Sequence, residues 1–185
     1  QPWEWIAVHD PELVSTLAAH LINTQEKAMF RSLLDTPPEF LEALMKLYRG
    51  LDQAPWWVVL CRHRRIQWGP PELNSLIRDW ELCALGAAMG ILMTAAVSLG
   101  LGSRWFGNPM LDPEPIKDLL NIPEQLEIIA VSPLGYHDQP PKERPEQDLE
   151  VHQQFSRGDR YALAGLLQGR LPWKEVTHMN TYRQP

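Results

Sequence analysis

The sequence predicts a layered α/β or α+β domain in which helices cover the faces of a β-sheet. Two observations carry this prediction. Short runs rich in β-branched and aromatic residues, typical of buried strands, occur at residues 5–9, 56–61 and 126–132. Marked helix starts and helical apolar spacing lie between these runs. With 185 residues, 44% of them hydrophobic, the chain is long enough to bury one sizeable core, so we expect a single domain.

Three helix starts are marked by a capping residue followed by proline and an acidic residue. They are Asp10-Pro11-Glu12, Thr36-Pro37-Pro38-Glu39 and Asp112-Pro113-Glu114. After the first of them, Leu13, Leu17 and Leu21 recur at helical spacing. Gly50 is expected to end the second helix, because glycine is the usual residue just past a helix C-terminus.

The most unusual stretch is an uncharged run of 21 residues from Leu82 to Gly102. It is long enough to cross a bilayer, but it is rich in small residues and nothing else in the chain is typical of a membrane protein. We therefore predict a helix near residues 72–100 that packs tightly on another helix, with Gly86 and Gly90 allowing close approach. Because this helix is apolar all round, we expect its own domain to enclose it or a second subunit to share it, and a dimer is the simpler account.

Charge and motif content exclude several function classes. The formal net charge of −6 argues against a nucleic-acid role, because binding a phosphate backbone requires clustered Lys and Arg. The sequence contains no GxSxG, HExxH, Walker or GxGxxG motif, and its six histidines lack metal-ligand spacing.

Cys61 and Cys83 are expected to be buried thiols. Asp79 and Glu81 are expected to compensate the dipole at the start of the long helix. If the protein is an enzyme, a cofactor is expected to supply the chemistry.

A flavin site requires cations at the phosphate, backbone donors near the ring and apolar walls, and the sequence offers a candidate for each. Lys142 and Arg144 are spaced to reach one anion, or they are a solvated pair in a Pro-rich loop. The glycines that follow the long helix, including Gly107, permit close approach to a planar ligand, or they serve caps and turns. Trp105 and Phe106 could wall a ring or fill the core.

Four segments occur in an order that carries more information than any one of them. They are Gln1-Pro2-Trp3; Ala95-Ala96 through Gly100-Leu101-Gly102-Ser103-Arg104-Trp105; Ile122-Pro123-Glu124 through Leu134-Gly135-Tyr136; and Lys142-Glu143-Arg144. In this order the chain resembles the nitroreductase family of flavin (FMN) enzymes. The resemblance implies an α+β domain over residues 1–155, with a central, mostly antiparallel sheet covered by helices and a long central dimer helix. Residues 156–185 are expected to form a C-terminal arm that packs on the partner subunit.

The same resemblance implies an FMN-dependent oxidoreductase that passes electrons from NAD(P)H to an electron-poor acceptor such as a nitroaromatic or a quinone. It implies a homodimer with no covalent catalyst and no metal, and we expect it to be cytoplasmic and to have no membrane or nucleic-acid partner. Lys142 and Arg144 would bind the FMN phosphate, and the Gly107 N–H would lie near N5 of the isoalloxazine. The residues implied in cofactor binding are Gln1, Trp105, Phe106, Gly107, Asn108, Lys142 and Arg144.

Departures from the family pattern leave alternatives open. The family's first flavin-binding segment would precede Gln1, so we expect the chain to be N-terminally truncated. Cys83 stands near a polar, ring-contacting position of many relatives, and Asn108 replaces a common glycine. The alternatives are the same fold with another flavin reaction, such as that of a dehalogenase or an oxidase, and a non-enzymatic dimer with or without flavin. Residues 23–53, the candidate segment for covering the pocket, contain no motif that decides among these reactions.

Overall fold

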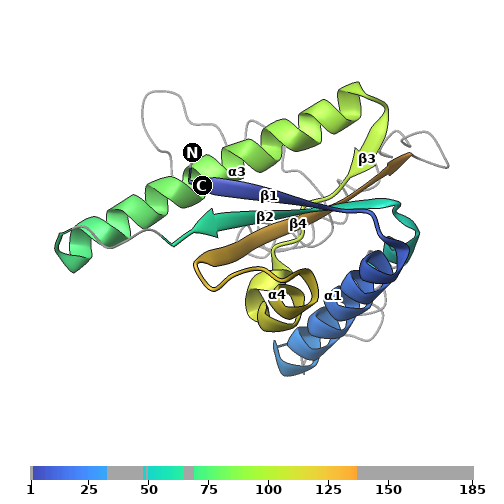
Figure 1. Ribbon diagram of the computed structural model, residues 1–185, viewed down its shortest axis with the longest axis horizontal. Helices are drawn as coiled ribbons and strands as arrows, with labels where there is room; N and C mark the ends of the chain where they lie inside the picture. The colour runs from blue at the N-terminus through green and yellow to red at the C-terminus, as the bar shows by residue number, and fades with distance from the viewer. Residues whose placement is uncertain (1, 33–47, 49, 65–68, 137–185) are drawn as a thin grey trace, which may run out of the picture. The chain divides into compact units, whose positions relative to one another are not determined.

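The computed structural model describes residues 2–32, 48, 50–64 and 69–136. In this part of the chain, a four-stranded antiparallel sheet has the strand order β1-β2-β4-β3. The strands are β1 (Trp3–Val8), β2 (Trp56–His63), β3 (Leu101–Ser103) and β4 (Leu126–Tyr136). Helix α3 (Pro71–Ser98) covers one face, and α1 (Pro11–Ser32) and α4 (Glu114–Leu120) cover the other (Figure 1). The predicted α+β fold, a helix-covered antiparallel sheet, is confirmed.

Local sequence signals account for most of these elements. The predicted strands at 56–61 and 126–132 lie within β2 and β4, and the one at 5–9 overlaps β1, which ends at Val8. The Asp10 carboxylate caps α1 by accepting hydrogen bonds from the backbone N–H groups of Glu12 and Leu13, at 3.0 and 3.1 Å. Helix α4 begins as predicted, but Pro113 occupies its N-cap position without a side-chain cap, so the capping role expected of Asp112 is wrong. The helix expected after Thr36 lies outside the described residues.

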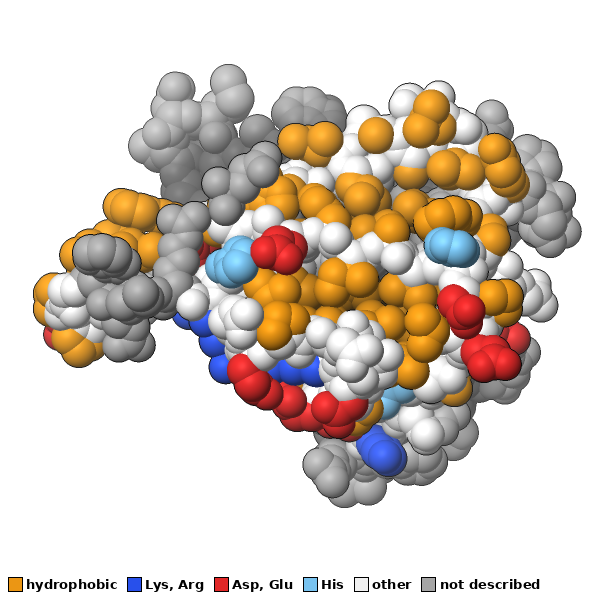
Figure 2. All heavy atoms as spheres, in the orientation of Figure 1, with side chains coloured by type: hydrophobic (Ala, Val, Ile, Leu, Met, Phe, Trp, Pro, Cys, Tyr) orange, Lys and Arg blue, Asp and Glu red, His pale blue; other side chains and the backbone are white. Residues whose placement is uncertain are grey.

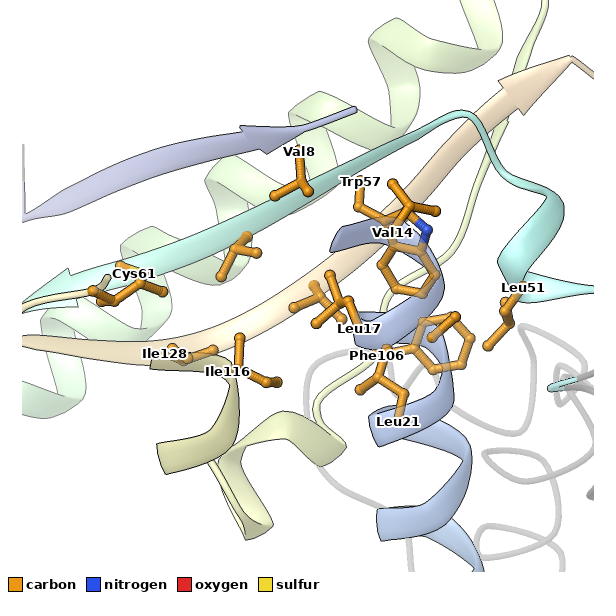
Figure 3. Packing of buried hydrophobic residues seen from close by; sticks show 14 of the residues in the cluster. Val8, Val14, Leu17, Leu21, Leu51, Trp57, Cys61, Phe106, Ile116 and Ile128 are labelled. Atoms are coloured by element: carbon orange, nitrogen blue, oxygen red, sulfur yellow. The ribbon is translucent and has the colours of Figure 1, made fainter. Parts of the chain in front are cut away.

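The main core fills the face of the sheet that carries α1 and α4. Figure 3 shows side chains from the strands and from these two helices pointing toward one another. The fully buried Trp57 of β2 packs there with Leu17 and Leu21 of α1 and Ile116 of α4. Two short 3-10 helices, η1 (Leu51–Gln53) and η2 (Asn108–Leu111), flank this layer. On the opposite face, a smaller cluster joins Leu60, Ile129 and Ala130 of the strands to Leu85 and Met89 of α3.

The two cysteines have different environments. Cys61 on β2 is fully buried, and burial, reinforced by the charge of Glu4, raises the pKa of its thiol to about 12. This thiol therefore stays protonated at neutral pH. Cys83 on α3 is exposed, so the expectation that both thiols are buried is wrong for this residue. The sequence was misleading here because α3 is apolar on its outer faces as well as on its inner face.

Helix α3 buries one narrow face in this chain and leaves the others open. Its buried residues are Glu81, Leu85, Met89 and Ala96. Hydrophobic side chains remain visible along it, both at the end that projects past the sheet and over its C-terminal half (Figure 2). The alternative that its own domain encloses this helix is therefore wrong for the part of the chain that the structure describes. By length and composition, α3 is also the one helix among the described residues that could cross a membrane.

A partly buried ion-pair cluster ties α3 to the sheet. The Arg62 guanidinium on β2 donates to Glu81 of α3 at 2.8 Å and to Glu127 of β4 at 2.9 and 2.7 Å. Arg78 of α3 reaches the second oxygen of Glu127 at 3.3 Å. Glu81 therefore lies in the interior of α3 and pairs with a strand residue, so its expected role in compensating the dipole at the helix start is wrong.

The pKa of Glu127 makes this cluster testable. Burial alone would raise that pKa, but the hydrogen bonds and charge of Arg62, helped by Arg78, outweigh burial and lower it below the ordinary value of 4.5. A depressed folded-state pKa adds stability that is present above the unfolded-state pKa and is lost as the pH falls through the folded-state pKa. We expect Glu127→Gln to lower the free energy of unfolding at pH 7 by about 1–3 kcal/mol, and this deficit to shrink on acidification below about pH 4.5.

Thermal or urea unfolding followed by circular dichroism, from neutral to acidic pH, measures this difference. Glu72→Gln, which changes an exposed glutamate on α3, is the matched control and should show a much smaller deficit. A deficit for Glu127→Gln that is the same at every pH would contradict the electrostatic account.

Candidate functional site

The site segment begins where α3 ends. The Leu99 N–H closes the helix by donating to the carbonyls of Ala95 and Ala96, both at 3.1 Å. Gly100 then adopts φ 73°, a left-handed conformation that favours glycine. This turn sends the chain back as β3, which pairs with the end of β4 from Leu101↔Tyr136 to Ser103↔Leu134. The glycine-rich sequence after α3, predicted to serve caps and turns or to approach a ligand, thus includes an edge strand.

Hydrogen bonds to β4 hold the backbone that follows β3. The Arg104 N–H donates to the Ser132 hydroxyl at 3.3 Å. Phe106 and Val131 exchange both backbone hydrogen bonds at 2.9 Å. Residues 104–106 therefore continue as extended chain, in which successive side chains point to opposite sides. Phe106 is 3% exposed and joins the core, whereas Trp105 is 42% exposed. Any ring surface that this segment presents to a ligand thus comes from Trp105.

An aromatic and cationic cluster supports the segment from the core side. The Phe106 ring lies 5.3 Å from that of Tyr48 and 6.4 Å from that of Trp57, measured between centroids. The Arg104 guanidinium lies 4.9 Å from the Phe106 centroid and 6.0 Å from that of Tyr48. Burial lowers the pKa of Arg104 and raises the pKa of Tyr48. The cluster fixes this face of the segment and leaves the opposite face to Trp105.

Gly107 is exposed and uncrowded where a side chain would stand. Its φ of −95° and ψ of −10° are accessible to any residue. A Cβ built on it would meet no atom within 4 Å, and the residue is exposed. Neither a left-handed turn nor crowding within the chain therefore requires glycine here. Asn108 follows as the first residue of η2, and its side chain lies outside the described part of the chain.

Three of the residues predicted to bind the cofactor, including both predicted phosphate ligands, fall outside the part of the chain that the structure describes. Gln1, Lys142 and Arg144 all lie outside the described residues, and β4 ends at Tyr136. Of the residues predicted to bind the cofactor, the structure brings together the segment 105–108 alone. Within the described ranges, no group of three or more His, Cys, Asp or Glu side chains could hold a metal ion.

An apolar groove of about 670 Å³ lies beside α3, and no residue pattern in the sequence predicted it. Trp3 and Trp5 of β1 form one wall, because residues two apart on a strand share a face. Small and aliphatic residues of the C-terminal half of α3 form the other wall. This half supplies Ala84, Ala87, Ala88, Ile91, Leu92, Ala95 and Ala96. The alternation of Trp3 and Trp5 was the available sequence signal, but only the packing of α3 on the sheet turns it into a groove.

Two curated relatives are similar to most of this chain. One, from Methanothermobacter thermautotrophicus, is a candidate NADH dehydrogenase/NAD(P)H nitroreductase that is 30% identical over 145 residues, which cover 65% of this chain and 72% of the relative. The other is an iodotyrosine deiodinase of Thermotoga neapolitana that is 25% identical over 153 residues, which cover 82% of this chain and 74% of the relative.

Solved structures show the same fold. A structure of iodotyrosine deiodinase bound to FMN and 3-iodo-L-tyrosine matches with a TM-score of 0.57 and 23% identity, over 78% of this chain and 72% of that one. The NADPH:FMN oxidoreductase of Vibrio harveyi, in complex with NAD+, matches with a TM-score of 0.59 and 20% identity over all of this chain, which spans 61% of the enzyme. The family model of the nitroreductase family matches residues 1–136, and this chain therefore belongs to the nitroreductase family.

Proposed function

We propose that this protein is an FMN-dependent oxidoreductase that passes electrons from NAD(P)H to an electron-poor acceptor such as a nitroaromatic or a quinone. The observation that carries the proposal is the segment 104–107, whose backbone is held by β4 and which ends in an open glycine beside a half-exposed indole. Membership of the nitroreductase family supports the reaction class. Of the two solved proteins of this fold described above, one is bound to FMN and the other is an NADPH:FMN oxidoreductase.

The described residues fit the ring part of FMN. Gly107 is exposed and nothing lies within 4 Å of a Cβ built on it, so a planar ring has room to approach the backbone of this residue. When bound, FMN would accept a hydride from NAD(P)H and pass the electrons on to the acceptor. The protein would contribute orientation: the Gly107 N–H would donate toward N5, the Trp105 indole would wall the ring, and Lys142 and Arg144 would hold the phosphate.

A second candidate function is reductive dehalogenation on the same fold. The observation in its favour is the 25% identity to an iodotyrosine deiodinase over 82% of this chain. The two candidates differ in the acceptor and not in the flavin. Nitroreduction requires an acceptor that takes electrons from a flavin reduced by NAD(P)H, whereas dehalogenation requires loss of halide from an aromatic substrate.

Anaerobic spectroscopy of the FMN-loaded protein tests the proposal. We expect NADH or NADPH to remove the absorption of the oxidised flavin and a nitroaromatic to restore it. Flavin that dithionite reduces but neither nucleotide reduces, and that releases iodide from 3-iodo-L-tyrosine, would favour the deiodinase reaction. Reduced flavin that no acceptor re-oxidises would contradict both candidate functions.

We also propose that the protein is a homodimer that shares α3. The outer side of this helix carries a shallow groove of about 550 Å³, and Ile91 on it is 71% exposed. The groove is lined by Ala87, Gly90, Ile91, Thr94, Ala95 and Ser98. Such a surface fits a second apolar helix. The C-terminal arm, residues 156–185, is proposed to pack on the same partner. Two free cysteines fit a reducing, cytoplasmic location.

Gly90→Leu tests the dimer without disturbing the single chain. A Cβ at Gly90 meets nothing within 4 Å, so a leucine there has room within its own subunit. At a tight contact between subunits it would overpack the interface and reduce the free energy of dimerisation by about 1–3 kcal/mol. We expect sedimentation to show a dimer for the wild type and a folded monomer for Gly90→Leu, with Gly90→Ala intermediate. A well-folded wild-type monomer at micromolar concentration would contradict the shared-helix proposal.

A further inference from the structure

We propose that Gly86 of α3 is a positioning residue that seats the Trp105 indole and thereby sets the clearance for a planar acceptor beside the segment 105–107. This inference rests on the proposed function, because it assigns part of the acceptor specificity of that same site. It concerns a residue that the sequence suggested for a different role, the contact between two helices.

The contact between Gly86 and Trp105 lies within one chain. A Cβ built on Gly86 would lie 3.5 Å from Cη2 of Trp105, an ordinary van der Waals distance, so the indole already touches this point of the helix and a side chain that extends beyond Cβ would meet the ring. Gly90, one turn later on the same helix, meets nothing within 4 Å. The two glycines of the GxxxG pattern therefore face different surroundings. Gly86 accommodates an aromatic ring of its own subunit, and Gly90 is open.

The indole is the movable part of this arrangement. On either side of Trp105, the backbone of Arg104 and Phe106 is hydrogen-bonded to β4, and the Phe106 side chain is buried. A larger side chain at position 86 would therefore displace the ring and not the main chain. Trp105 is 42% exposed, so its open side is the direction in which it can turn. In the proposed site, that side belongs to the bound ligands.

This geometry predicts an effect on acceptor binding that exceeds the effect on turnover. Gly86→Val adds methyl groups that reach beyond Cβ toward the ring, so we expect the KM for a planar nitroaromatic to rise by about tenfold, the scale of a misfit of one or two methyl groups in a binding pocket. The kcat should stay within about twofold. Ferricyanide, which does not have to stack on a ring, should show little change in KM. Gly86→Ala, whose Cβ makes an ordinary contact at 3.5 Å, should have a smaller effect.

A double-mutant cycle with Trp105→Ala tests whether Gly86 acts through the indole. We expect Gly86→Val to raise the nitroaromatic KM in the wild-type background and to have no further effect once the indole is removed. Ser75→Val places the same side chain on an exposed position of α3 and controls for the cost of a β-branched residue in a helix. An equal rise in KM with and without Trp105, or no rise at all, would overturn the inference.

A measurement without cofactor separates this inference from the proposed function. Acrylamide quenching of tryptophan fluorescence, taken as the difference between proteins with and without Trp105, reports the exposure of that one indole. We expect Gly86→Val to increase this exposure. If the wild type binds no FMN, the proposed function fails, and this readout still decides whether Gly86 seats Trp105. If FMN binds but exposure of Trp105 does not change, the positioning role fails and the proposed function stands.

Discussion

Replacing both Lys142 and Arg144 with alanine is expected to weaken FMN binding by about 2–4 kcal/mol, the scale of losing charge-assisted hydrogen bonds to a phosphate. The two cations are separated by one residue, and side chains two apart in an extended segment would point to the same side, where both would reach one anion. A fluorescence titration, in which bound FMN is quenched or enhanced relative to free FMN, measures the loss.

Riboflavin provides the matched ligand control, because it has the same ring and no phosphate. The affinity of the protein for riboflavin should change little with the double substitution. Equal losses for FMN and riboflavin would place Lys142 and Arg144 away from the phosphate. Each single substitution should account for part of the loss, although two residues that bind one group need not contribute additively.

Gly107→Val is expected to abolish flavin binding and NAD(P)H oxidation while leaving the apo-protein as stable as the wild type. Gly107 has an ordinary φ of −95°, and a Cβ there meets nothing within 4 Å, so valine fits the isolated chain. In the proposed site, the same side chain would occupy the space of the flavin edge and separate the backbone N–H from N5. The measurements are the melting temperature without cofactor and the FMN dissociation constant.

Gly100→Val is the matched control in the same segment. Gly100 has φ 73°, so valine there strains the backbone and should cost about 1 kcal/mol or more of apo-protein stability. The folded fraction should retain more flavin affinity than Gly107→Val does. A large apo-protein destabilisation by Gly107→Val, together with near-normal FMN affinity, would count against the assignment of this glycine to the ring.

The elements predictable from sequence are those with local causes. The start of α1 follows from the Asp10 cap, and β2 follows from a run of aromatic and β-branched residues. Strand β3 is only the three residues Leu101-Gly102-Ser103. This short segment forms a strand because it pairs with the edge of β4. No local pattern in the sequence could reveal that partner.

The site residues divide in the same way. That Trp105 and Phe106 lie near a glycine-rich turn was readable from sequence, but which ring is buried depends on the hydrogen bonds between Phe106 and Val131. Two contacts of α3 join residues that are 19 positions apart in the sequence: the ion pair of Arg62 with Glu81 and the contact of Trp105 with Gly86. Such contacts depend on how α3 crosses the sheet, which sequence spacing alone does not define.

The most direct test of the central claim is the visible spectrum of the purified protein after incubation with FMN and removal of free ligand. The account predicts a yellow protein with a flavin spectrum shifted from that of free FMN, a stoichiometric amount of FMN, and loss of that colour in Gly107→Val. A correctly folded protein that stays colourless and does not change the fluorescence of added FMN would contradict it.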